Sequence, residues 1–210
     1  LQKVLHLTHG PYSNPYELTT FYDNHDMARI NATDEGFINA HNWLFTVRGI
    51  PVVYMGSEIG FMRGTAEHAG NRNYVGQERL DQAKNHPIQQ ALAKIANVRK
   101  NTVALQRGVQ VNLELNGHRA AFYRVVDTKD AKQTALVLLN KGNVAESFDV
   151  NDFMQSGEWK EQLSGQTQTV KQGDALTATV EPNGVQVWVR EGKVSNSELL
   201  AQIKYQLARQ

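Results

Sequence analysis

The run FYDNHD at residues 21–26 is the stretch whose residue types could form a catalytic cluster. It brings two carboxylates, Asp23 and Asp26, next to His25 directly after a β-rich stretch at residues 18–22. In a (β/α)8 barrel the carboxyl ends of the strands hold the active site, which favours a functional role for this cluster. Asp, Asn and His are also common in loops and caps, so a hydrogen-bonded turn would explain the same residues.

A helix should follow this run, and a buried strand should follow the helix. Thr33 is a suitable N-cap, and the acids in the next two positions suit the positive end of a helix dipole. Apolar residues and one histidine then recur with helical spacing, at Phe37, Ala40, His41, Leu44 and Phe45. We interpret His41 as a buried, hydrogen-bonded histidine and not as a ligand. Gly49 ends the helix, and IPVVYM at residues 50–55 is as apolar as a parallel strand buried on both faces.

A polar, glycine-rich loop is expected at residues 56–85, and a second helix is expected from Pro87, a favourable first helical residue. The apolar stripe of this helix comprises Ile88, Ala91, Leu92, Ile95 and Ala96. The order strand, helix, strand, helix is typical of a parallel α/β sheet or barrel.

After Gly108 the hydrophobic period changes to two, which predicts short antiparallel strands. These strands are expected at residues 109–115, 119–126, 134–139, 146–150, 166–170, 176–180 and 185–189. Asn116-Gly117 indicates a hairpin between the first two. Short strands at this spacing predict an antiparallel β-sandwich. Ser195, with Glu198 three residues later, predicts a capping box that opens a short amphipathic helix ending near Leu207.

Composition excludes several classes of function. Twenty-two basic and twenty-one acidic residues leave a formal charge of +1, and no basic block suggests nucleic acid or an acidic membrane as a partner. No apolar run is long enough for a membrane helix. Without cysteine there is neither a disulfide framework nor thiolate chemistry, and the histidines have no metal-like spacing.

Two motifs in the expected order carry a family resemblance. FYDNHD resembles the F-x-x-N-H-D motif at the seventh barrel strand of the α-amylase family, glycoside hydrolase family 13. Further along, GIPVVYMGSE at residues 49–58 is similar to that family's G-I-P-x-I-Y-Y-G-x-E segment on the eighth strand, with Met55 in place of the second tyrosine. IANVRK at residues 95–100 and PNGVQVW at residues 182–188 look like its last barrel helix and C-terminal sandwich.

The resemblance implies a fold and a division of the chain. Residues 1–107 would be the last two βα units of a (β/α)8 TIM barrel, residues 108–192 an antiparallel β-sandwich domain, and residues 193–210 a terminal helix or linker. Members of this family cleave or transfer α-1,4-linked glucose units with retention, through a nucleophile, an acid/base and a third carboxylate. The first two lie on the fourth and fifth barrel strands, which have no counterpart before residue 21. We therefore expect the chain to be the C-terminal part of a longer enzyme, inactive alone, with the N-terminal part of that enzyme as its partner.

The resemblance also assigns roles within the first motif. Asp26 would be the third carboxylate, which holds sugar hydroxyls beside the anomeric carbon and, as an anion, raises the pKa of the acid/base. His25 would donate hydrogen bonds to the same hydroxyls, and Asn24 would shape the turn. We interpret Asp23 as a structural cap. Arg29 could pair with the carboxylate cluster or complete a structural salt bridge.

In the second motif and the loop after it, each candidate residue could have either a role at the site or a structural role. Glu58 could orient groups near the site or form a structural ion pair. Some relatives use an Asn-Arg pair in this loop to contact sugars, which would make Asn71 and Arg72 substrate-binding residues, although the aspartate that often accompanies the pair is a histidine here. Tyr74 and Phe61 could stack on sugar faces or serve as lid and core residues.

The resemblance leaves three functions open. The first is an α-amylase that hydrolyses starch and maltooligosaccharides. The second is a glucanotransferase such as cyclodextrin glucanotransferase, and the third is a non-catalytic carbohydrate-binding module. Many members bind calcium through a domain inserted earlier in the barrel, so calcium is expected only for a full-length enzyme, and no cofactor is expected in this segment. The nature of the substrate implies a secreted or periplasmic enzyme.

Overall fold

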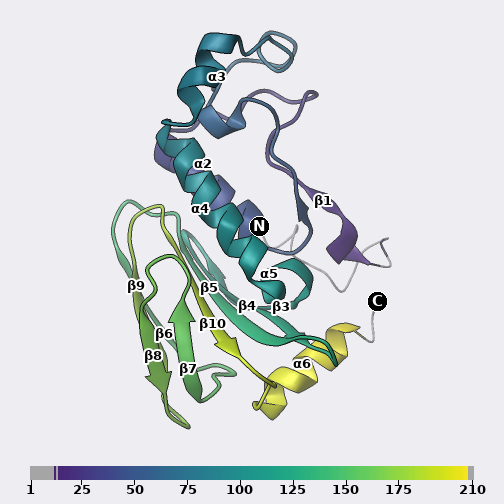
Figure 1. Cartoon of the computed structure of the whole chain (residues 1–210), viewed down its shortest axis with the longest axis vertical. Helices are drawn as coiled ribbons and strands as arrows, with labels where there is room; N and C mark the ends of the chain where they lie inside the picture. The colour runs from purple at the N-terminus through teal and green to yellow at the C-terminus, as the bar shows by residue number, and fades with distance from the viewer. Residues whose placement is uncertain (1–11, 13, 208–210) are drawn as a thin grey trace.

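The computed structural model describes Tyr12 and residues 14–207, and combines a short parallel strand pair with long antiparallel sheets (Figure 1). The N-terminal elements are η1 (Pro15–Glu17), β1 (Thr19–Thr20), α2 (Asp34–Thr46), β2 (Ile50–Pro51), η2 (Ser57–Ile59), α3 (Gln77–Ala83), α4 (Pro87–Asn101) and α5 (Val103–Arg107). They are followed by β3 (Val109–Asn116), β4 (Arg119–Asp127), β5 (Lys132–Asn140), β6 (Glu146–Val150), β7 (Gly157–Glu161), β8 (Thr167–Val170), β9 (Leu176–Val180), β10 (Val185–Glu191) and α6 (Ser197–Leu207). The predicted mixture of α/β and antiparallel β structure is confirmed.

The N-terminal elements form a strand–helix–strand unit in which β1 and β2 pair in parallel, with Thr19 opposite Ile50. Thr33 caps α2 as predicted, because its hydroxyl accepts from the Gly36 amide at 3.3 Å. Gly49 ends the connection with φ +93°, and a Cβ there would lie 2.8 Å from the Leu18 carbonyl oxygen. The close approach of the two strands therefore requires glycine at this position. Both strands are shorter than the apolar runs suggested.

α4 begins at Pro87 as predicted and packs along α2, so the two helices run side by side in Figure 1. The stretch 56–85, predicted as a loop throughout, contains η2 and the helix α3. None of the α3 residues is buried, so this helix has no apolar stripe that the sequence could display. An amide-to-carboxylate hydrogen bond from Gln77 to Asp81, one turn apart, supports it instead (2.8 Å).

The C-terminal half consists of a six-stranded sheet in the order β3-β4-β5-β10-β7-β8 and a separate pair, β6-β9. One face of the large sheet packs against β6, β9 and α6 around Trp159, Phe148 and Leu199. Its other face packs against α4 and α5 around Phe122 and Val137. Because both faces are covered, every residue from the second to the last of β5 is buried.

One strand of this sheet, β7, is absent from the predicted set. Its sequence, GEWKE, contains a single large apolar residue, Trp159, which is fully buried. Glu161 at its end is also buried, and its carboxylate accepts from the backbone amides of Val187, Leu163 and Ser164. In the sequence, a glutamate is expected to be exposed to solvent. A buried Glu161 therefore interrupts the apolar pattern by which a strand is recognised, and β7 was not predicted.

Two local predictions need correction. The hairpin predicted at Asn116-Gly117 is present, but its register pairs Asn116 with Arg119, which moves the two-residue loop to Gly117-His118. The terminal helix begins at Ser197, and its cap is Asn196, whose side-chain oxygen accepts from the Leu199 amide at 2.9 Å. The amide of Ser195 donates to Gln155, so Ser195 lies before the cap.

Two buried arginines bind carbonyl groups at the C-terminal end of α2, and the second of them joins the N-terminal elements to the sheet. Arg99 of α4 donates to the carbonyl oxygens of Phe45, Val47 and Gly49, at 2.7 to 3.2 Å. Arg124 of β4 donates to the Thr46 carbonyl at 2.9 Å. A helix C-terminus carries partial negative charge, so the two cations lie where the helix dipole favours them.

Candidate active site

The segment after β1 turns sharply and exposes two side chains of the first motif. Asn24 forms the turn, because its side-chain oxygen accepts from the Asp26 backbone amide at 2.7 Å. His25 and Asp26 point to solvent, with side-chain exposures of 57% and 62%. This hydrogen bond is the one expected of a residue that shapes the turn, which is the role predicted for Asn24.

Asp26 lies between two cationic or potentially cationic groups. Its Oδ1 accepts from Arg72 Nη2 at 2.7 Å, and its Oδ2 lies 3.1 Å from His25 Nε2. The structure thus brings together three residues predicted to contact substrate. Since all three are more than half exposed, their mutual contacts are open to replacement by a ligand.

Asn71, the fourth residue predicted to bind substrate, occupies a different position. Its side chain is fully buried. Its amide donates to the backbone carbonyl of His25, and its oxygen accepts from the His68 amide at 3.1 Å. The Tyr54 hydroxyl donates to the Asn71 carbonyl. Asn71 therefore fastens the 66–74 loop under the motif and presents its neighbour Arg72 to Asp26.

Behind the exposed residues lies a buried ion pair. Arg29 Nη1 donates to Asp23 Oδ2 at 3.2 Å, with both side chains at most 2% exposed. Ser57 Oγ donates to the same oxygen at 2.9 Å, and Arg29 Nε donates to the Gly70 carbonyl at 3.1 Å. Of the two roles open to Arg29, the structure selects the salt bridge, with Asp23 and not with Asp26. Asp23 holds the motif to η2 and is not a cap.

Further inside, Tyr22 and His41 form a hydrogen-bonded pair at 2.7 Å. His41 is fully buried on α2, as its position in the apolar stripe predicted. Burial lowers the pKa of His41 to about 4, and burial together with nearby Asp23 raises the pKa of the Tyr22 phenol. Both rings are therefore uncharged at neutral pH and anchor the end of β1 to α2.

The remaining candidates differ in exposure. Tyr74 is 82% exposed and lies two residues after Arg72 in the loop. Phe61 is buried, with the guanidinium groups of Arg29 and Arg79 at 5.8 and 5.3 Å from its ring centre, which is a core arrangement. Glu58 lies half-buried in η2, and within residues 14–207 it forms no ion pair.

In the described part of the chain, no group of three or more histidine, aspartate or glutamate side chains is arranged to hold a metal ion. No helix in that part combines the length and apolar character needed to cross a bilayer.

Comparison with known proteins gives a consistent set of relatives. No family model matches the chain. It is 28% identical over 184 residues to the β/α-amylase of Paenibacillus polymyxa, covering 81% of this chain and 14% of that protein. It is 26% identical over 205 residues to the cyclomaltodextrin glucanotransferase of Bacillus sp. strain 1-1, covering 93% of this chain and 28% of that enzyme. The chain thus spans less than a third of the length of either relative.

A solved structure has the same fold. The α-amylase of Geobacillus thermoleovorans superposes with a TM-score of 0.73 at 23% identity, over 87% of this chain and 41% of that one. The resemblance predicted from the two motifs is thereby confirmed: over most of its length, this chain is related to the α-amylase-family enzymes, the α-amylases and cyclomaltodextrin glucanotransferases.

Proposed function

We propose that this chain is the C-terminal portion of a retaining enzyme that hydrolyses α-1,4-glucosidic bonds in starch or maltooligosaccharides, with Asp26 as the carboxylate that stabilises the transition state. The observation that carries the proposal is the exposed Asp26 at the carboxyl end of β1, flanked by His25 and Arg72. Relatives named as amylases and glucanotransferases support the substrate class.

The proposed architecture is the end of a (β/α)8 barrel, residues 1–107, followed by a β-sandwich at residues 108–192 and a terminal helix from residue 193. The parallel pairing of β1 with β2, with α2 between them, is the repeating unit of such a barrel. A cavity of about 590 Å³ lies beside β1 and α2 and is lined by residues such as Phe21, Trp43 and Leu44. Such an apolar cavity supports the proposal that further polypeptide packs there. The N-terminal part of the same enzyme is the proposed occupant.

Asp26 would act by holding sugar hydroxyls next to the anomeric carbon. A carboxylate accepts hydrogen bonds only, so the hydroxyls donate to its two oxygens. In the substrate complex these donors would replace His25 and Arg72, whose exposed contacts cost little to break. Fixed negative charge beside the anomeric carbon also stabilises the positive charge that develops there in an oxocarbenium-like transition state.

His25 and Arg72 would then be free to donate to the ring hydroxyls that Asp26 does not reach. Asn71 would position both residues: His25 through the hydrogen bond to its carbonyl, and Arg72 because it is the next residue in the chain. Exposed Tyr74 offers a ring for stacking on a sugar face. Asp23, the other carboxylate of the motif, is buried in its ion pair and would serve as neither nucleophile nor acid/base. We propose that these two groups come from the N-terminal part of the enzyme.

The test is kinetic. In the enzyme that contains this chain, Asp26→Asn should lower kcat on maltoheptaose by about 10²- to 10³-fold, whereas the control Asp130→Asn, at an exposed position on the β4–β5 turn, should not. The 210-residue chain alone should release no reducing sugar from soluble starch. Full activity of the Asp26→Asn enzyme, or activity of the isolated chain, would refute these assignments.

The alternative is a glucanotransferase, since cyclomaltodextrin glucanotransferases align with as much as 97% of this chain. Chromatography of the products from starch separates the two reactions: a hydrolase gives linear oligosaccharides and a cyclising transferase gives cyclic ones. We propose secretion or export to the periplasm for either enzyme, because polymeric starch does not enter cells.

A further inference from the structure

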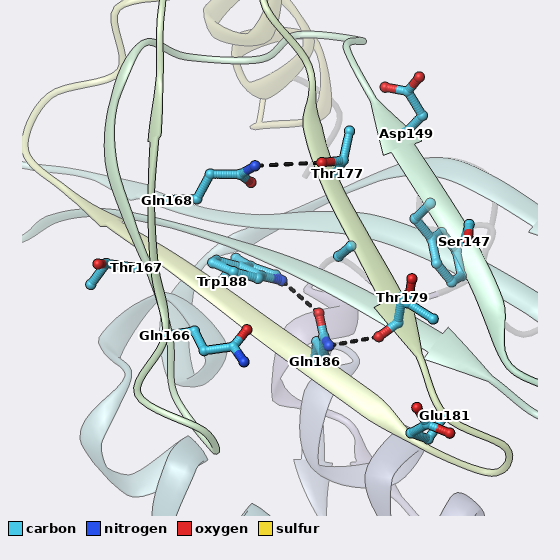
Figure 2. A pocket seen from close by; sticks show the side chains of 12 residues that line it. Ser147, Asp149, Gln166, Thr167, Gln168, Thr177, Thr179, Glu181, Gln186 and Trp188 are labelled. Atoms are coloured by element: carbon cyan, nitrogen blue, oxygen red, sulfur yellow. Dashed lines mark hydrogen bonds between the residues drawn. The ribbon is translucent and has the colours of Figure 1, made fainter.

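A groove of about 760 Å³ opens at the edge of the antiparallel region, between β8 and β9 (Figure 2). β10 contributes Gln186 and Trp188 to its lining, and β6 contributes Ser147 and Asp149. None of the lining residues comes from the 21–29 segment or the 66–74 loop. The volume lies within the range of about 300–1,000 Å³ that is typical of small-molecule sites.

The groove is lined by amides at positions that would otherwise complete the core. In β8, Val170 faces the core, and the alternation of a strand places Gln168 on the same face. In β10, Trp188 faces the core, and Gln186 lies two residues before it on the same face. Gln166, just before β8, continues the first row. Polar residues at core-facing positions usually destabilise a domain, so their presence here favours a functional role.

The hydrogen bonds of these amides show which of them are occupied. The Trp188 indole N–H donates to Gln186 Oε1 at 2.9 Å, and Gln186 Nε2 donates to the Thr179 carbonyl at 2.9 Å, as Figure 2 shows. Gln186 is thus fixed, and Trp188 contributes only apolar surface. Gln168 Nε2 reaches Thr177 Oγ1 at the long distance of 3.5 Å.

The other end of the Gln168 amide lacks a partner. Its Oε1 is a buried acceptor with no hydrogen bond in the part of the chain that the structure describes. Leaving a buried acceptor unpaired costs about 1–3 kcal/mol. Rotation of the Gln168 amide toward the groove would let a donor from a bound molecule, such as a hydroxyl, pair with this oxygen and remove the cost. Gln168 is therefore the residue on which a ligand is expected to depend most.

The charge of the lining restricts the ligand further. No lysine or arginine lines the groove, and its two charged residues, Asp149 and Glu181, are acids, so an anionic ligand such as a phosphate is disfavoured. The hydroxyls of Ser147, Thr177 and Thr179 and the amides can each donate and accept. A neutral molecule with many hydroxyl groups matches this inventory, and an apolar ligand does not.

We propose that the β8–β9 groove is a binding site for a neutral oligosaccharide, with Gln168 as its principal contact. The assignment to an α-linked glucan rests on the proposed function, whereas the assignment to a neutral sugar rests on the groove alone. The site would hold a segment of a polymeric substrate on the antiparallel region and so raise the local concentration of chain ends or loops near the barrel.

The test is calorimetric titration of the 210-residue chain with maltoheptaose. Gln168→Leu should weaken binding by at least about tenfold, since it removes the unpaired acceptor. The Tm of this variant should stay the same or rise, because leucine completes the core-facing row. A purely structural glutamine would give a lower Tm instead. Thr169→Ala, at the adjacent exposed position of β8, is the matched control and should bind normally.

Two further measurements separate this proposal from the proposed function. Asp26→Asn should leave calorimetric binding to the groove unchanged. If Asp26→Asn abolishes binding and Gln168→Leu does not, the groove is not the site, while the proposed function survives. If the unaltered chain binds no maltoheptaose, the groove proposal is overturned, and the kinetic test of Asp26 still stands. Equal binding of cellohexaose, which is β-linked, would overturn the assignment to α-glucans.

Discussion

The guanidinium of Arg72 lies 2.7 Å from the carboxylate of Asp26, joining positions 46 residues apart in the chain. The contact links the turn after β1 to the 66–74 loop. Both side chains are more than half exposed, so water competes with the pair and its net contribution to folding is small. The adjacent residue, Asn71, is fully buried and makes its contacts with backbone groups. In the 66–74 loop, the contact of Arg72 with Asp26 can therefore be exchanged for water or a ligand, whereas the contacts of its neighbour Asn71 are fixed by burial.

This difference gives a paired prediction. Arg72→Met should change the free energy of unfolding by less than about 1 kcal/mol. Asn71→Ala should lower it by about 1–3 kcal/mol, because the His25 carbonyl and the His68 amide both lose their hydrogen bonds to the buried Asn71 side chain. Urea denaturation of the 210-residue chain measures both. A larger loss for Arg72→Met than for Asn71→Ala would contradict the assignment of Asn71 as the residue that fastens the loop.

The buried pair of Asp23 and Arg29 should be far more sensitive. Asp23→Asn leaves the Arg29 charge buried without its counter-ion, and we expect a loss of about 3–5 kcal/mol in unfolding free energy. The matched control is Asp34→Asn, which breaks an ion pair with Arg63 of 2.6 Å whose side chains are 36% and 34% exposed. That loss should be below about 1 kcal/mol. Equal losses would show that burial does not determine the strength of the first pair.

His41 should make the stability of the chain depend on acid. Its pKa is lowered from 6.5 to about 4 by burial, so between these values the unfolded chain binds more protons than the folded chain. Stability contributed by the neutral His41 is therefore fully present above pH 6.5 and is lost as the pH falls toward 4, by up to about 3 kcal/mol. Urea denaturation at several pH values measures the slope.

His41→Gln should flatten this part of the pH profile, since glutamine does not titrate and still offers the Tyr22 hydroxyl a hydrogen-bond partner. The control is His118→Gln, at a half-exposed position where the imidazole pairs with Glu146. If the slope between pH 4 and 6.5 were unchanged in His41→Gln, another group would be responsible for the acid sensitivity.

Local patterns in the sequence predicted the elements whose burial follows a simple period. The cap at Thr33, the start of α4 at Pro87 and the strands β3 to β6 were all readable in this way. The helix α3 has no buried face. In β7, the buried residue Glu161 is charged and is held by backbone hydrogen bonds, so it does not appear in an apolar pattern. Periodicity reports only apolar burial, so elements stabilised by polar contacts escape it.

For the site, the sequence predicted which residues lie at the end of β1 but not how they pair. Arg29 is three residues from Asp26 and six from Asp23, yet it pairs with Asp23, because the turn at Asn24 directs Asp26 outward. The burial of Asn71 depends on a loop that returns across 46 residues to reach His25. Such choices between partners are decided by tertiary packing, which spacing along the chain does not encode.

The last prediction concerns Arg124, which is fully buried in β4 and has no acidic partner in the described chain. Its guanidinium donates to the Gly108 carbonyl at 3.1 and 3.2 Å and to the Thr46 carbonyl at 2.9 Å. Burial, with a smaller effect of nearby Arg99, lowers its pKa to about 9. The charged form persists at neutral pH because three donors are satisfied and the end of α2 is partially negative.

Arg124→Met removes these donors and leaves two buried carbonyls unpaired, so it should lower the free energy of unfolding by about 2–4 kcal/mol. Arg124→Lys keeps the charge but cannot bridge both carbonyls, and its loss should be smaller. Arg107→Met, at an exposed position in α5, is the control and should have little effect. A more stable Arg124→Met chain would show that the cost of burying the charge exceeds the gain from its hydrogen bonds. The joint between α2 and the sheet would then depend on apolar packing and on the hydrogen bonds from Asn39 and Asn42 of α2.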